Sequence, residues 1–220
     1  NIFGTDTILA IVKKYKIKKF VFISSDKAVN PKSYLGISKR LAEIITQNWK
    51  KNKTSIVRFG NVFGSQGSAI ELFIHQLNKN LPITITNLKA KRFFMSIREA
   101  CNLVLNVTEL NGSDMIYILN MGKQILVKDI IYKLAEIKNI NTKNIILKEI
   151  GLKKGEKLSE ELSINKKFKK TFNKEIFLVK EPTYNHSIVE NILKRLEFEM
   201  KNFDEKKLRN TIFNFLKKEQ

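Results

Sequence analysis

Residues 18–31 read Lys-Lys-Phe-Val-Phe-Ile-Ser-Ser-Asp-Lys-Ala-Val-Asn-Pro, and this stretch decides the fold. Val21-Phe22-Ile23 is a short run of β-branched and aromatic residues, which is typical of a buried parallel strand. Asn30-Pro31 then breaks the chain into a turn. Because open α/β sheets bind ligands beyond the carboxyl ends of their strands, polar side chains that directly follow this strand are candidates for a functional site.

Three polar side chains occupy that position. Ser25 offers a hydroxyl donor, Asp26 a carboxyl group and Lys27 an amine. Side chains of these types can bind a hydroxylated substrate and move protons to and from it. The alternative interpretation is a strand end, a polar turn and a solvated lysine.

The next element is predicted to be a helix over residues 34–49. Ser33 can cap its first turn. Its apolar residues recur at helical spacing, namely Leu41, Ile44, Ile45 and Trp49. Lys39 lies on the first turns, and helical side chains lean toward the N-terminus. We therefore expect Lys39 to point back toward the polar residues that follow the strand.

Helices and strands alternate along the chain, which predicts an α/β fold. The architecture expected is the C-terminal half of a doubly wound parallel sheet with a smaller α/β substrate-binding region. Expected helices are 6–15, 34–49, 69–77, 97–110, 127–137, 188–200 and 205–217, and expected strands are 21–23, 54–59, 83–86, 115–119 and 145–150. The last helix has Asp204 as its expected N-cap.

Three regions follow from this pattern. Residues 1–68 are expected to form the second half of a sheet domain with the active-site segment. Residues 69–186 are expected to interleave the substrate-binding region with the last elements of that sheet, and residues 187–220 to form a helical tail.

Composition narrows the class of protein. A chain of 220 residues can bury a substantial core, and its 43% hydrophobic content is ordinary for a globular protein. The single cysteine, Cys101, lies in an apolar helical stretch, where we expect it to be buried in packing. With one cysteine and only two histidines, His75 and His186, no metal site is expected.

The net charge of +20 raises the question of nucleic-acid binding. The excess is mostly lysine, scattered through every predicted helix, and no basic stripe with interleaved stacking aromatics occurs. We therefore expect no nucleic-acid partner. The densest cluster, residues 166–170, is predicted to lie in a loop, where contact with an anionic membrane surface is an alternative role.

Six further motifs occur in an order that resembles one enzyme family. They are Asn1-Ile2-Phe3-Gly4-Thr5, residues 58–68 (Arg-Phe-Gly-Asn-Val-Phe-Gly-Ser-Gln-Gly-Ser), residues 92–97, Asn120-Met121-Gly122, residues 151–162 and residues 177–182. With the segment 24–39, this order is similar to the extended short-chain dehydrogenase/reductases of bacterial polysaccharide biosynthesis. These are the UDP-N-acetylglucosamine 4,6-dehydratases and their capsule-synthesis relatives, which have a Rossmann-type fold.

The resemblance implies a reaction and catalytic roles. The family oxidises the sugar C4 hydroxyl with bound NAD, eliminates water across C5 and C6, and returns the hydride to C6. By resemblance, Ser25 bonds the C4 oxygen, Asp26 protonates the departing C6 hydroxyl, and Lys27 removes the C5 proton. Lys39 holds the nicotinamide ribose.

The resemblance also implies binding residues. Those expected to contact NAD are Ser24, Lys39, Phe59 and Gly60, and those expected to contact a UDP-sugar are Asn61, Ser68, Arg92, Lys153 and Glu156. Arg92 is the best candidate phosphate ligand, with a plain surface arginine as the alternative. Lys153 stands where the family has arginine, so it keeps the charge but loses the bidentate fork.

One position departs from most short-chain dehydrogenases, which have a tyrosine four residues before the lysine. Here that residue is Leu35, and Tyr34 is no substitute because it lies roughly 140° around the helix from Lys39. The large membrane-anchored members carry methionine at this place, so Leu35 points to that subclass. The alternative is a decayed, inactive copy.

The second departure is an absence: the sequence shows no glycine-rich loop, Gly-x-Gly-x-x-Gly or a close variant, between a first strand and helix, as nicotinamide-binding folds have. Gly60, Gly64 and Gly67 fit a loop that touches the sugar phosphate, with a plain glycine turn as the alternative. We expect the adenine-binding half of the cofactor site to lie upstream of Asn1, so that the isolated chain binds NAD poorly and turns over little.

No run of 18 or more apolar residues occurs, so no segment of this chain is expected to span a bilayer. The resemblance implies a homo-oligomer located in the cytoplasm or, through upstream residues, at the cytoplasmic face of the inner membrane. Two other functions stay open, a UDP-sugar 4-epimerase and a non-catalytic degenerate fragment.

Overall fold

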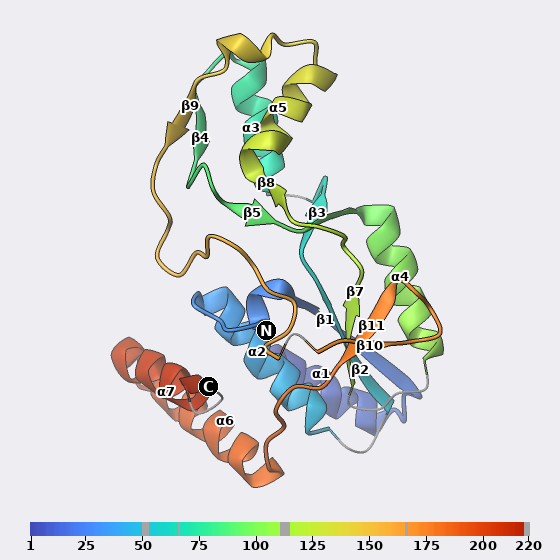
Figure 1. Cartoon of the computed structure of the whole chain (residues 1–220). Helices are drawn as coiled ribbons and strands as arrows, with labels where there is room; N and C mark the ends of the chain where they lie inside the picture. The colour runs from blue at the N-terminus through green and yellow to red at the C-terminus, as the bar shows by residue number, and fades with distance from the viewer. Residues whose placement is uncertain (50–52, 66, 111–114, 166, 218–220) are drawn as a thin grey trace.

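The computed structural model describes residues 1–49, 53–65, 67–110, 115–165 and 167–217. Figure 1 shows two parts: a lower part built around a sheet, and an upper part that holds α3 (Ala69–Asn78) and α5 (Val127–Ile137). The α/β fold class predicted from the sequence is confirmed.

A five-stranded sheet forms the lower part, in the order β1-β2-β7-β11-β10. Three strands are parallel, as predicted, and two antiparallel strands extend the sheet beyond β7. The parallel strands are β1 (Lys19–Ser25), β2 (Lys53–Phe59) and β7 (Met115–Leu119). Strand β11 (Ile176–Val179) pairs antiparallel with β7, and β10 (Lys169–Lys170) pairs antiparallel with β11. In this register Ser25 lies beside Phe59, so β1 and β2 end together.

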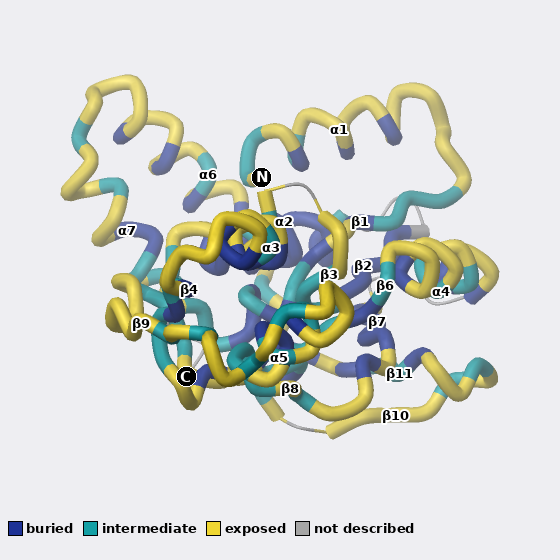
Figure 2. The backbone as a smooth tube through the Cα atoms, turned by 90° about the horizontal axis from the view of Figure 1, so that it is seen from above, coloured by how far each residue is buried: buried dark blue, intermediate teal, exposed yellow. Residues whose placement is uncertain are grey.

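Helices cover both faces of the sheet because side chains alternate along each strand. On one face α2 (Tyr34–Gln47) packs on a cluster that includes Phe22, Ile56 and Ile116. On the other face α4 (Ile97–Glu109) packs on Val57, Tyr117 and Leu119. Figure 2 shows the strands between these helices, with buried backbone concentrated in the sheet and in α2.

The upper part has its own core, in which α3 and α5 pack on the parallel pair β4 (Ile83–Ile85) and β9 (Leu147–Glu149). Two short pairs connect the parts, β3 (Asn61–Phe63) with β6 (Phe94–Ser96), and β5 (Lys91–Arg92) with β8 (Ile125–Leu126). Residues 69–186 thus alternate between the two parts, and the division at residues 68 and 186 stays a prediction.

A helical hairpin ends the described chain, formed by α6 (His186–Lys201) and α7 (Glu205–Lys217). Val189, Leu196 and Ile212 of the hairpin join one apolar cluster with residues of α2 and of α1 (Ile2–Lys14). Asp204 accepts from the backbone N–H of Lys207 at 2.9 Å, as expected of an N-cap.

Four sequence predictions need correction. Cys101 is exposed, because it lies one residue past the inward-facing Ala100 of α4 and is therefore turned about 100° away from it. Lys169 and Lys170 lie in strand β10, and Lys166 lies outside the described residues.

The other two corrections concern element bounds. Helix α1 begins at Ile2 because Ile2 and Phe3 pack against the cluster under α2. Strand β9 is shorter than expected, and at its start the Ile145 N–H bonds back to Thr142 of the preceding 3₁₀ turn, Thr142–Asn144.

A buried ionic network joins the sheet to α2. Arg58 of β2 donates from Nε and Nη2 to Glu43 of α2, at 2.7 and 2.6 Å, and from Nη1 to Oε1 of Glu181 at 2.7 Å. Arg40 and Ser24 also donate to Glu43, at 3.1 and 2.6 Å. The side chains of both arginines and of Glu43 have no exposed surface, so their charges are compensated by one another instead of by water.

The charged groups of this network stabilise each other's ionised forms. Burial by itself raises the pKa of Glu43, but the charge and hydrogen bonds of Arg58, with Arg40 and Ser24, hold that pKa below its ordinary value. Burial lowers the pKa of Arg58, and Glu43 and Glu181 more than offset this, so it lies above its ordinary value. Both groups are ionised at neutral pH.

Replacing Glu43 should therefore lower the stability of the folded protein at neutral pH. Glu43→Gln keeps the shape but leaves two buried arginines short of a negative charge, so urea denaturation at pH 7 should show a loss of about 3–5 kcal/mol in unfolding free energy. Because the folded pKa of Glu43 is depressed, its contribution is full above the unfolded value of about 4.3 and is lost as the pH falls through the folded value.

The difference between wild type and Glu43→Gln should accordingly shrink below about pH 4. Glu136→Gln is the control, since its partner Lys133 and Glu136 itself are both exposed, and it should cost well under about 1 kcal/mol. A difference that stays constant down to acid pH would contradict the assigned role of the Glu43 charge.

Candidate active site

The polar residues after β1 form one connected group. Residues Asp26–Ala28 make a single 3₁₀ turn, η1, directly after the strand. Ser25 Oγ donates to Oδ1 of Asp26 at 2.8 Å and accepts from the backbone N–H of Lys27 at 3.3 Å. Lys27 Nζ lies 3.0 Å from the same Asp26 oxygen and 3.1 Å from Oδ1 of Asn61. The structure thus brings together Ser25, Asp26 and Lys27 with Asn61, a residue of β3.

The Asp26 carboxyl is completely buried beneath this group. Its Oδ2 has no hydrogen-bond partner among the described residues. Gly60 makes room for that oxygen, since a Cβ there would lie 2.9 Å from it and 2.8 Å from Cβ of Phe93. Lys27 keeps 27% of its side chain exposed, so it is the basic member of the group that a ligand can reach directly.

Helix α2 brings Lys39 to the same end of β1. Ser33 caps the helix as predicted, accepting from the Gly36 N–H at 3.1 Å. Lys39 Nζ donates to the Ile23 carbonyl at 2.8 Å and lies 5.0 Å from the centre of the Phe22 ring. Burial lowers the pKa of Lys39, and the Glu43 charge opposes that shift. Lys39 therefore points back along β1.

Tyr34 is turned away from this site and toward the C-terminal hairpin. Its ring meets that of Phe213 edge-on at 6.3 Å between centroids, and Arg209 lies over it. Leu35 is half exposed on the first turn of α2. Neither residue supplies an acid or base to the group around Lys27.

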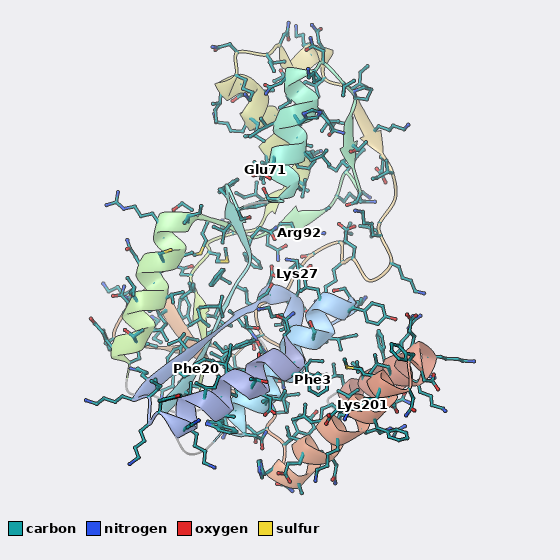
Figure 3. The ribbon with its side chains drawn as sticks, turned by 180° about the vertical axis from the view of Figure 1, so that it is seen from behind. Phe3, Phe20, Lys27, Glu71, Arg92 and Lys201 are labelled. Atoms are coloured by element: carbon teal, nitrogen blue, oxygen red, sulfur yellow. The ribbon has the colours of Figure 1, made fainter. Side chains whose placement is uncertain are left out.

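A cavity of about 570 Å³ lies next to Asn61, where the lower and upper parts of the molecule meet. All five residues predicted to bind a UDP-sugar line it: Asn61, Ser68, Arg92, Lys153 and Glu156. Figure 3 shows Arg92 between Lys27 and Glu71 at this junction. The hydrogen bond between Lys27 and Asn61 thus connects the group of Ser25, Asp26 and Lys27 to the cavity wall.

Arg92 is held inside this wall, so the alternative of a plain surface arginine is wrong. Its side chain is 9% exposed and its Nη2 donates to Oε1 of Glu156 at 2.8 Å. Glu156 also accepts from Thr86 Oγ1 at 2.8 Å and from the Lys153 N–H at 3.1 Å. The exposed Lys153 contributes its backbone to this arrangement, while its side chain stays available to a ligand.

The loop before α3 borders the cavity with Gly67 and Ser68. Gly64 and Gly67 have φ values of +74° and +72°, which favour glycine. Ser68 Oγ is buried without a hydrogen-bond partner among the described residues, at the N-terminus of α3. Gln66 lies outside the described residues. The backbone N–H of Gly67 at this helix start already donates to Oε2 of Glu71 at 2.8 Å.

Of the four residues predicted to bind NAD, three are placed where a ligand could contact them and one is engaged elsewhere. Lys39 uses one of its three N–H bonds on Ile23, which leaves donors for a ribose hydroxyl. Gly60 and the half-buried Phe59 lie at the end of β2, beside the Asp26 carboxyl. The Ser24 hydroxyl is bonded to Glu43 instead. Lys39 and Gly60 are thus the side of the site that suits a nicotinamide ribose.

Sequence reasoning missed the partners of Arg58 and the contacts of Thr86. Glu43 carried a detectable signal, because it is an acid between Leu41 and Ile44 on the apolar side of a predicted helix, a position that demands a buried partner. Thr86 gave no such signal. Among the described residues no cluster of metal-ligating side chains occurs, and no helix is long and apolar enough to cross a membrane.

Residues 1–181 match the family described as polysaccharide biosynthesis protein. The capsular polysaccharide biosynthesis protein CapD of Staphylococcus aureus is 41% identical over 166 residues, which cover 74% of this chain and 28% of that protein. A UDP-glucose 4-epimerase of Rickettsia rickettsii is 33% identical over 169 residues, covering 74% of this chain and 48% of that protein. The chain spans less than half the length of either relative.

Two solved structures are similar to this chain in fold. The X-ray structure of Pen from Bacillus thuringiensis superposes with a TM-score of 0.74 at 33% identity, covering 83% of this chain and 59% of that one. A dTDP-glucose 4,6-dehydratase from Bacillus anthracis, in complex with NAD, gives a TM-score of 0.63 over 70% of this chain and 56% of that one; at 17% identity this shows the fold alone. From its ordered motifs, its fold and a match over 1–181, the chain belongs to the family described as polysaccharide biosynthesis protein.

Proposed function

We propose that the full-length protein containing this chain is an NAD-dependent 4,6-dehydratase that converts a UDP-N-acetylhexosamine, UDP-N-acetylglucosamine by resemblance, to a 4-keto-6-deoxy sugar. The observation that carries this proposal is the position of the Lys27 amine, held between Asp26 and Asn61 beside the cavity. We place the enzyme in surface-polysaccharide synthesis, as a homo-oligomer in the cytoplasm or at the cytoplasmic face of the membrane.

The chain's residues divide the work as follows. NAD, when bound, supplies the oxidation at C4 and the reduction at C6. Ser25, which is partly exposed, binds the C4 oxygen, and Lys27 takes the C5 proton. Asp26 shares its Oδ1 with both neighbours and supplies the proton with which the C6 hydroxyl leaves as water. Arg92 and Lys153 bind the diphosphate.

A UDP-sugar 4-epimerase is the second candidate, and the similarity to the epimerase of Rickettsia rickettsii favours it. An epimerase oxidises and reduces C4 but removes no proton from C5. The amine of Lys27 beside the cavity has a role in the dehydratase that an epimerase does not require. A degenerate copy is the third candidate, since Leu35 cannot move a proton.

Solvent isotope incorporation distinguishes these three functions. With UDP-N-acetylglucosamine in D₂O, the full-length dehydratase should form the 4-keto-6-deoxy product with deuterium at C5, because the proton taken there is replaced from solvent. Lys27→Ala should lower product formation by about 10²–10⁴-fold. NMR of the product and the rate of its formation are the measurements.

Lys79→Ala is the control, since Lys79 is exposed at the end of α3 and is not among the residues that line the cavity, and it should leave the product and its isotope pattern unchanged. A 4-epimer without deuterium at C5 would establish the epimerase, and no product from any UDP-sugar would establish the degenerate copy. Either result would refute the dehydratase assignment.

The lysine at position 153 gives a second test, at the nucleotide. Lys153→Arg restores a fork that can bind phosphate oxygens in pairs, so it should tighten UDP binding by up to about tenfold, measured by calorimetry. Lys154→Arg is a matched control because its neighbour Lys153 lines the cavity and it does not. Equal effects of the two substitutions would contradict the placement of the diphosphate beside Lys153.

A further inference from the structure

One segment, residues 153–162, runs between the upper and lower parts and contacts both; we call it the strap. On its upper side Glu156 binds Arg92, and the Leu158 carbonyl accepts from the Lys91 N–H at 2.9 Å. In Figure 1 this part of the chain descends from β9 and passes close to the start of α2. The strap is therefore attached to the cavity wall.

The lower side of the strap contacts the turn that follows η1, residues 29–33. Lys157 Nζ donates to the Val29 carbonyl, and Asn30 Nδ2 donates to Oε2 of Glu161 at 2.7 Å. Gly155 has φ +83°, and a Cβ there would lie 2.6 Å from the Lys32 carbonyl oxygen. Backbone approach of this kind leaves no room for a side chain, so the strap and the turn fit closely.

Asn30 is the strained residue of this turn, with φ +41°. Residues other than glycine avoid positive φ, although asparagine tolerates it better than most. Its backbone sets the direction in which the chain leaves η1, the turn that contains Lys27, before Pro31 and α2. The hydrogen bond that Asn30 donates to Glu161 fixes the Asn30 side chain and thereby favours this backbone conformation over relaxed alternatives.

The chain on the other side of Lys27 is restrained as well. The first turn of α2 approaches so closely that a Cβ on Gly36 would lie 2.2 Å from the Lys27 carbonyl oxygen. Helix α2 thus limits the position of η1 from one direction, and the strap holds the turn 29–33 that connects them. A shift of that turn would move the Lys27 amine relative to Asp26 and Asn61.

We propose that Glu161 is a positioning residue that acts through Asn30 and keeps the Lys27 amine between Asp26 and Asn61. The expected effect of Glu161 on kcat rests on the proposed function of Lys27. The expected effect on the backbone of residues 26–33 does not. Glu161 lies 131 residues from Asn30 in the sequence, and it is not among the residues that line the cavity.

A rescue experiment on the full-length enzyme tests this. Glu161→Ala should lower kcat roughly ten- to hundredfold with little change in KM for the UDP-sugar, because Lys27 is misplaced while the nucleotide contacts remain. Glu161→Gln retains an acceptor for Asn30 and should stay within about threefold of wild type. Asn30→Gly removes the strain itself, so the double variant Glu161→Ala/Asn30→Gly should recover most of the lost kcat.

Hydrogen–deuterium exchange supplies a readout that needs no catalysis. Amides of residues 26–33 should exchange faster in Glu161→Ala than in wild type, and the added Asn30→Gly should reverse part of this. Glu149→Ala is the matched control, because it removes a similar bond, from Asn87 Nδ2 at 3.0 Å, within the upper part. It should leave kcat and the exchange of residues 26–33 unchanged.

Two results would overturn the positioning role. One is unchanged exchange at residues 26–33 in Glu161→Ala, and the other is a loss of kcat that Asn30→Gly does not relieve. Failure of the dehydratase assignment is distinguishable, because wild-type protein would then form no 4-keto-6-deoxy product while the exchange difference persisted.

Discussion

The contact of Arg58 with Glu43 and Glu181 is the constraint on which the rest of the structure depends. Removing such charges from water costs several kcal/mol per ion, and the cost is offset only where geometry and hydrogen bonding are nearly ideal. The network therefore admits one arrangement of β2, α2 and the segment that follows β11. It also fixes the end of β1, since Ser24 bonds to the same carboxylate as Arg58.

The active-site geometry follows from that fixed arrangement. Because β1 and β2 end in register, Asp26 meets the backbone of Gly60 and Lys27 meets Asn61, although these partners lie far apart in the sequence. The Arg58 guanidinium also binds the Leu162 carbonyl at the end of the strap. One buried arginine thus connects the strands that present Ser25, Asp26 and Lys27 to the strap, which holds the turn beyond them.

Much of the fold could be predicted from local sequence, because strands, amphipathic helices and caps depend on neighbouring residues. The features that could be predicted in this way include strand β1, helix α2 with its Ser33 cap, and the group of Ser25, Asp26 and Lys27. The rest depends on contacts between distant positions. Nothing near Asn30 indicates that Glu161 binds it, and nothing near Asp26 indicates its complete burial. Cys101 was misplaced because an apolar stretch does not state which residue of a helical turn faces inward.

These contacts show how the site is held together when residue 35 is a leucine and not a tyrosine. Lys39 lies four residues on, and its amine is bonded to the Ile23 carbonyl, so the lysine is held by the backbone of β1 without a phenol beside it. Tyr34 is packed against Phe213 of the C-terminal hairpin, a hairpin that lies beyond the family match at residues 1–181. Under the proposed function, proton transfer falls to Asp26 and Lys27. Both belong to one 3₁₀ turn, whose backbone is restrained by α2 at Gly36 and, one residue beyond the turn, by the strap at Val29. Under that proposal the turn must hold these two groups accurately without help from a tyrosine, and residues distant in the sequence restrain it from both sides.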